Sequence, residues 1–223
     1  NDDTRPVLAG VCVKFSGKEL KLAATDSYRL AEKRIILDKE VGEKEVIVPA
    51  RTLNEVSRIL SQSEMDDDIE IIIEENQIFF IVADVQIVSR LIECAFPNYA
   101  QIIPATTKIT VTADVSETLN ALKMSALFSK DIANNIKLLV GKNEITVKSS
   151  ASETGDTTSK ISAKTSGGEL EIAFNARYLI DVMNVLNGKT VEMKFNDDSA
   201  PGIISSDKDE NYLYLAMPLK TDN

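Results

Sequence analysis

The chain has 223 residues, of which 43% are hydrophobic and 27% charged, a balance that excludes the disordered and collagen-like classes. This length is enough for two ordinary domains with real cores, and no apolar run approaches the roughly 18 residues of a membrane-spanning helix. The net charge of −10 excludes a protein that coats nucleic acid over its whole surface, but it allows a local basic stripe.

Few residues of the kinds that carry catalysis are present. The sequence has no His, which removes the usual general base and the commonest metal ligand, and it contains no glycine-rich phosphate loop or paired-cysteine metal motif. We therefore expect no enzyme activity, no metal and no cofactor. The two cysteines, Cys12 and Cys94, lie in apolar, strand-like segments, which favours buried free thiols over a disulfide. Free thiols in turn favour a cytoplasmic location.

The first half of the chain alternates short apolar runs with turn residues, which predicts antiparallel strands. One amphipathic helix is expected at 51–62, where the apolar positions are spaced by three and four. The strands are predicted at 7–15, 19–25, 28–36, 45–49, 69–74, 77–83 and 86–94. Segment 96–104 contains two prolines and a turn-forming Asn, and we interpret it as a linker.

The second half repeats this order with one additional helix. Helices are predicted at 114–128 and 177–186, and strands at 107–112, 136–141, 144–150, 157–165, 170–175, 190–196, 201–206 and 212–217. Many strands with few helices indicate an α+β protein dominated by antiparallel sheet, with one domain at 1–104 and the other at 105–223.

An internal repeat relates the two halves. The segment VIVPARTLNEVSRIL (46–60) aligns with IAFNARYLIDVMNVL (172–186), so that Arg51 falls on Arg177, an offset of 126 residues (177 − 51). The preceding hairpin VKFSGKELKL (13–22) aligns with LLVGKNEITV (138–147) at an offset of 125 (138 − 13). The chain is therefore expected to contain two related units, each with sheet and helix.

The predicted helix 114–128 has no counterpart in the first half. Asp114 and Glu117 are spaced as in a capping box, and the apolar face consists of Val115, Leu119, Leu122 and Ala126. A counterpart would precede Arg5. We therefore expect that the chain begins inside its first unit and that this unit is less stable than the second.

Six segments together resemble one known family, the bacterial replicative sliding clamp, which is the beta subunit of DNA polymerase III. They are TRPVLAG (4–10), ATDSYRL (24–30), VIVP (46–49), FPNY (96–99), FNARY (174–178) and YLAMPL (214–219). The resemblance implies the DNA clamp (processivity) fold, with the second domain lacking its start and the third domain present. It also implies a homodimeric ring around duplex DNA, whereas a chain without the first domain is expected to be monomeric and unable to close a ring alone.

The resemblance implies two sites. Helices that line such a ring carry positive charge toward phosphates and read no bases, since phosphate contacts position without specifying sequence. The DNA-facing candidates are Arg5, Arg51, Arg58 and Lys123, and the alternative is that they are ordinary solvated charges.

The second implied site is a groove between the two domains, where polymerases, the clamp loader and repair proteins dock a short peptide with apolar anchors. Its candidate residues are Leu8, Thr25, Ser27, Tyr28, Leu30, Pro97, Ile102, Asn175, Tyr178, Leu215, Met217, Pro218 and Leu219. The alternative is that some of them simply fill the core between the domains.

Two other functions stay open at this point. A peptide-binding interaction module unrelated to replication would use the same groove. A hydrolase without His, acting through Asp, Ser and Lys, would need carboxylates that converge in a pocket.

Overall fold

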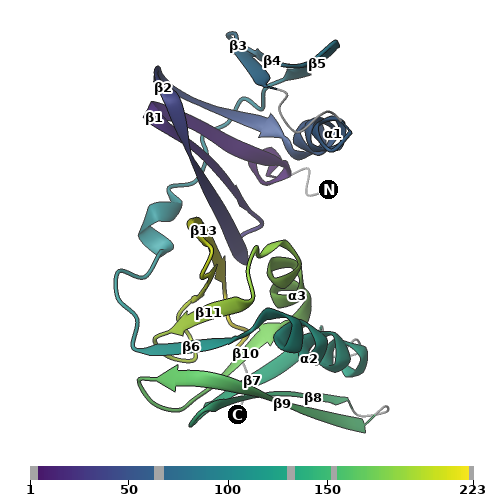
Figure 1. Ribbon diagram of the computed structural model, residues 1–223, viewed down its shortest axis with the longest axis vertical. Helices are drawn as coiled ribbons and strands as arrows, with labels where there is room; N and C mark the ends of the chain where they lie inside the picture. Colours follow the sequence, from purple (N-terminus) through teal and green to yellow (C-terminus); the bar gives the residue numbers. More distant parts are fainter. Residues whose placement is uncertain (1–4, 63–67, 130–133, 152–154, 221–223) are drawn as a thin grey trace. The chain divides into compact units, whose positions relative to one another are not determined.

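The computed structural model describes residues 5–62, 68–129, 134–151 and 155–220. The described chain forms two compact units (Figure 1). The first contains Asn1–Ser27 and Glu32–Asn98, and the second contains Tyr28–Ala31 and Tyr99–Asn223. Tyr28–Ala31 thus packs with the second unit although it lies inside the first part of the sequence.

The first unit consists of two sheets and one helix. After a 3-10 turn at Pro6–Ala9 come two long strands, β1 (Gly10–Thr25) and β2 (Arg29–Pro49), and then helix α1 (Ala50–Leu60). Strands β3 (Ile69–Ile73), β4 (Gln77–Val82) and β5 (Val85–Arg90) form an antiparallel sheet in the order β3-β4-β5. Val56 of α1 belongs to one hydrophobic cluster with Ile78 and Phe80 of β4, so the helix covers one face of this small sheet.

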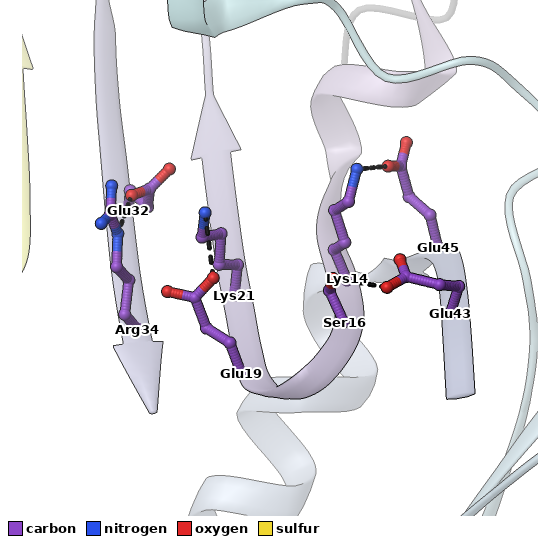
Figure 2. Close-up of polar contacts among 8 residues, drawn as sticks. All are labelled: Lys14, Ser16, Glu19, Lys21, Glu32, Arg34, Glu43 and Glu45. Carbon is purple, nitrogen blue, oxygen red and sulfur yellow. Dashed lines mark hydrogen bonds and ion pairs between the residues drawn. The ribbon is translucent and has the colours of Figure 1, made fainter. Parts of the chain in front are cut away.

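Charged residues on β1 and β2 form ion pairs and hydrogen bonds (Figure 2). Lys14 pairs with Glu45 at 3.0 Å and thereby joins the two strands, and the Ser16 hydroxyl donates to Glu43 over 2.6 Å. The carboxylate of Glu32, only 4% exposed, accepts a hydrogen bond from Arg34 at 2.7 Å. This pairing satisfies a charge that would be costly to bury alone.

The second unit carries two helices on a longer antiparallel array. After a second 3-10 turn at Tyr99–Ile102, the helices are α2 (Val115–Phe128) and α3 (Ala176–Val185), and in Figure 1 they lie against the strands. The strands run in the order β13-β12-β11-β6-β9-β8-β7-β10. They are β6 (Ile109–Asp114), β7 (Asn135–Gly141), β8 (Glu144–Ala151), β9 (Gly155–Ser166), β10 (Leu170–Asn175), β11 (Thr190–Phe195), β12 (Gly202–Ser206) and β13 (Asp209–Ala216).

The core of the second unit is much the larger. Its cluster of buried residues includes Phe174 and Phe195, whose ring centroids are 6.1 Å apart. A Cβ atom on Gly202 would lie 2.9 Å from the Phe195 ring and 3.0 Å from the Phe174 ring, so this position needs glycine for the two rings to fit. Asp114 caps α2 by accepting a hydrogen bond from the Glu117 amide at 2.9 Å, as the sequence predicted.

The predicted fold class is confirmed, because every strand pair with a described register is antiparallel and all three predicted helices form. The helices begin and end within two residues of the predicted bounds. The beginning of the predicted strand 7–15 is wrong: Pro6–Ala9 forms a 3-10 turn, since proline is favoured in a first helical turn and donates no ladder hydrogen bond. The predicted strands 7–15 and 19–25 are continuous in the structure as β1. The chain turns within this element at Gly17, which adopts a positive φ of 59°.

The cysteine prediction is half right. Both thiols are free, and Cys12 is buried, but Cys94 is exposed because it follows the end of β5 rather than lying in a strand. Burial raises the pKa of the Cys12 thiol to about 11, with Glu45 adding to the shift. Across the described chain, every helix is too short or too polar to traverse a bilayer.

Candidate nucleic-acid and partner-binding sites

The first unit contributes three of the basic candidates. Arg51 and Arg58 are exposed on α1, and Arg5, also exposed, precedes the 3-10 turn and donates to the Ser27 hydroxyl at 3.0 Å. The apolar face of α1 buries Val56, whereas Leu60 is 36% exposed at the helix end. Since exposed cations can approach a polyanion without desolvating a core, the placement of these residues suits weak phosphate contact.

Arg58 is already paired within its own helix. Its guanidinium makes two hydrogen bonds to Glu55, from Nε at 3.0 Å and from one terminal nitrogen at 2.5 Å. The bond to Glu55 raises the pKa of Arg58, and the same bond lowers the pKa of the Glu55 carboxyl. A phosphate would therefore compete with a carboxylate at Arg58.

The fourth basic candidate, Lys123, is exposed on α2 in the second unit. Its neighbours Met124 and Leu127 are 52% and 59% exposed. The exposed side of α2 thus carries apolar as well as basic side chains.

The second unit brings together most of the predicted groove residues. The Met217 amide donates to the Tyr28 carbonyl at 2.8 Å, which attaches the end of β13 to the Tyr28–Ala31 segment. The Tyr214 hydroxyl donates to the Tyr178 carbonyl at 2.9 Å and so ties β13 to α3. Tyr28 is 59% exposed and Met217 is 36% exposed, which leaves apolar surface for a ligand.

Arg29 fixes the orientation of Tyr178. Its guanidinium carbon lies 4.6 Å from the centroid of the Tyr178 ring, and its nitrogen pairs with Asp181 one turn further along α3 at 2.5 Å. A cation over an aromatic face is attractive, and the ion pair holds the cation in place. The ring of Tyr178 is thus presented in one orientation. Sequence reasoning did not include Arg29 or Asp181 among the site residues.

A pocket of about 320 Å³ lies in the second unit beside the end of the chain. Met217, Pro218 and Leu219 line it together with Ala173, and the Leu219 amide donates to the Ala173 carbonyl at 2.8 Å. Its rim includes the Lys137–Glu171 ion pair, whose nitrogen and oxygen are 2.6 Å apart. Five of the ten lining residues are charged or polar, so the pocket offers polar partners as well as apolar contact.

The other groove candidates of the second unit differ in their accessible surface. Leu30 and Leu215 are 1% and 2% exposed, so they support the second unit from inside. Asn175 caps α3, its side-chain oxygen accepting from the Arg177 amide at 2.9 Å. Ile102 is 47% exposed, at the end of its 3-10 turn.

The remaining candidates belong to the first unit. Leu8 is half-buried in the 3-10 turn, and Pro97 is exposed in the segment after β5. The Thr25 hydroxyl accepts from the Ser27 amide at 3.1 Å, and Ser27 has a positive φ of 77°. This bond stabilises the tight turn that leads from β1 to Tyr28.

Across the described residues, no group of three or more carboxylates or thiols gathers as metal ligands would. Asp197 accepts hydrogen bonds from the Ser199 amide and hydroxyl and from the Ala200 amide. These bonds, first of all that from the Ser199 amide, lower the pKa of Asp197. The carboxylate therefore organises a turn.

The architecture defines a protein of the DNA-clamp fold class: antiparallel sheet with helix α1 in the first unit, and antiparallel sheet with helices α2 and α3 in the second. The central-domain model of the DNA polymerase III beta subunit matches residues 1–98, and the C-terminal-domain model of the same subunit matches residues 100–220. The chain belongs to the DNA polymerase III beta subunit family.

Individual relatives agree with this assignment. The chain is 33% identical over 221 residues to the beta sliding clamp of Staphylococcus aureus and 32% identical to that of Staphylococcus epidermidis. Each alignment covers 98% of this chain and 58% of the length of the curated relative. The crystal structure of the Bacillus subtilis sliding clamp superposes with a TM-score of 0.93 at 30% identity, over 100% of this chain and 59% of that one. The Pseudomonas aeruginosa beta subunit shares the fold, with a TM-score of 0.93 over 99% of this chain and 60% of that one.

Proposed function

We propose that this chain is the partner-binding portion of a cytoplasmic sliding clamp, a non-catalytic processivity factor that encircles duplex DNA and tethers polymerase, clamp loader and repair proteins. The observation that carries the proposal is the pocket in the second unit, which the predicted anchor residues Met217, Pro218 and Leu219 line. Family membership favours this function over an unrelated interaction module. We further propose that these 223 residues by themselves are monomeric and close no ring.

The chemistry of the proposed groove suits a short peptide with apolar anchors. Met217 is flexible and exposed, which allows it to adapt to several ligands, while the fixed ring of Tyr178 offers a flat apolar wall. Among the other groove candidates of the second unit, Tyr28 and Ile102 are also exposed and could contact a peptide. Recognition would be by shape and burial, with no covalent step.

The test is fluorescence polarisation with a labelled peptide from the clamp-contacting segment of a bacterial polymerase. We expect the double variant Met217→Ala, Tyr178→Ala to lose about 1–3 kcal/mol of binding free energy, the usual scale for losing an anchor contact. Met124→Ala is the matched control, since it removes an exposed methionine from α2 in the same unit. Absence of binding to the folded chain, or equal losses in both variants, would contradict the proposed groove.

The DNA-binding role rests on the exposed cations of the helices. We propose that Arg5, Arg51, Arg58 and Lys123 make weak contacts to phosphates without reading sequence. Weak contacts of this kind suit a protein that slides, because affinity then depends on salt rather than on bases.

A further inference from the structure

An apolar row crosses the outer face of the β3-β4-β5 sheet. Ile72, Phe79 and Val88 are paired across the three strands in one row, and they point away from the buried row Ile71–Phe80–Ile87. Ile72 is 41% exposed and Val88 is 52% exposed, while Phe79 and Ile81 on the same face are half-buried. Helix α1 packs on the opposite face, where the Thr52 and Ser89 hydroxyls lie 2.8 Å apart.

Two other surfaces show that such an apolar face is not general in this chain. On β1 and β2, charged residues are paired along the strands (Figure 2). In the second unit, β11 is the counterpart of β3, and its outward side carries the ion pair Glu192–Lys194 at 2.5 Å. The outward residues of β11 are Thr190, Glu192 and Lys194, whereas those of β3 are Glu70 and Ile72. β11 therefore presents polar and charged side chains outward at the place in the fold where β3 presents Ile72.

Acidic residues border the row. Glu70 lies two residues before Ile72 on the same face of β3, and Glu74 lies two residues after it; both are exposed. Arg90, the only basic residue of β3, β4 and β5, is exposed on the same face two residues after Val88, so two carboxylates and one guanidinium border the row. A second copy of this chain would bring a like-charged border against this one, which electrostatics disfavours. A partner with apolar side chains flanked by lysine or arginine complements both the row and its border.

We infer that the outer face of β3-β4-β5, defined by Ile72, Phe79, Ile81 and Val88, is a docking surface for a basic amphipathic segment of a partner protein. The apolar row supplies the buried contact, and Glu70 and Glu74 attract the flanking cations. This surface lies wholly in the first unit. It is therefore separate from the proposed peptide pocket, whose lining residues all belong to the second unit.

The test uses the whole chain and a synthetic 14-residue peptide of leucine and lysine, with leucine at the spacing of one helix face. Two control peptides replace leucine by serine or lysine by glutamate. The variant Ile72→Thr, Val88→Thr keeps β-branched residues in the strands, and Ile203→Thr is the matched control on the outward side of β12 in the second unit. A second variant, Glu70→Lys with Glu74→Lys, alters only exposed charges.

We expect the leucine–lysine peptide to bind at least fivefold more weakly to the threonine double variant and to the charge variant, and within twofold of the parent to Ile203→Thr. Isoleucine methyl resonances should shift at Ile72 and Ile81 and not at Ile203. Equal affinity for the serine control peptide, or unchanged affinity in the double variant, would overturn the proposal. Sedimentation that shows self-association abolished by the double variant would overturn it in favour of a second copy.

Discussion

The two units build the same position of their cores in different ways. In the second unit, Phe174 and Phe195 fill it against Gly202. In the first unit, the residue that aligns with Phe174 at the repeat offset of 126 is the smaller Val48, which is also fully buried.

The units also differ in how much they bury. The second unit has α2 and α3 over its strands and a large buried cluster, whereas the described first unit has α1 alone and a cluster of six buried residues. Since stability comes mainly from apolar burial, we expect the first unit of this chain to open more readily than the second. The contrast shows that one repeat can retain a fold with a much smaller core.

The largest expected effect concerns the first unit. Ile78→Ala should destabilise it by about 2–5 kcal/mol, because the side chain is fully buried and its removal leaves a cavity. Alkylation of Cys12 in a Cys94→Ser background measures the effect, since a buried thiol whose pKa is about 11 reacts at pH 8 only after opening. Faster alkylation with unchanged proteolysis of the second unit is expected. Simultaneous loss of both units would contradict independent stabilities.

Gly202→Ala adds volume to the core of the second unit, whereas Ile78→Ala removes volume from the core of the first. The added methyl would press against both phenylalanine rings, so we expect a loss of about 1–3 kcal/mol from overpacking. Urea unfolding followed by tyrosine fluorescence provides the measurement. Gly42→Ala is the control, because Gly42 is exposed and an added methyl group would contact nothing there. Equal midpoints for the two variants would show that the rings can shift freely.

The helix caps provide a smaller effect. α2 and α3 begin with side-chain caps from Asp114 and Asn175, whereas α1 begins at Pro49 without one. Asp114→Ala should cost about 1 kcal/mol, as expected for losing a capping bond. Thermal unfolding by circular dichroism would detect it, and Asp114→Asn should recover most of the loss because asparagine also caps.

The smallest expected effect is on the affinity of the chain for DNA. Arg51→Ser should weaken binding to a nonspecific duplex severalfold and reduce the slope of log affinity against log salt by about 1, since one phosphate contact is lost. Glu55→Gln should strengthen binding, because Arg58 is released from its internal partner. Fluorescence anisotropy across a salt series measures both. Indifference to both substitutions would indicate that α1 does not face DNA.

Much of this fold could be predicted from periodicity alone. The repeat of VIVPARTLNEVSRIL and IAFNARYLIDVMNVL placed α1 and α3 correctly, because amphipathic spacing and strand length are local properties. The site was less accessible to prediction. Met217, Pro218 and Leu219 were identified through the resemblance, but the pairing of Leu219 with Ala173 and the stacking of Arg29 on Tyr178 join residues far apart in the chain. No local pattern determines such contacts.

Hydrogen exchange across the whole chain, measured in rising concentrations of urea, tests the unequal stability of the two units most directly. The account predicts that amides of β7, β8 and β10 exchange only by global opening of the second unit, while those of β1 and β4 exchange earlier through a separate opening. Exchange of all five strands with one common free energy and urea dependence would contradict it.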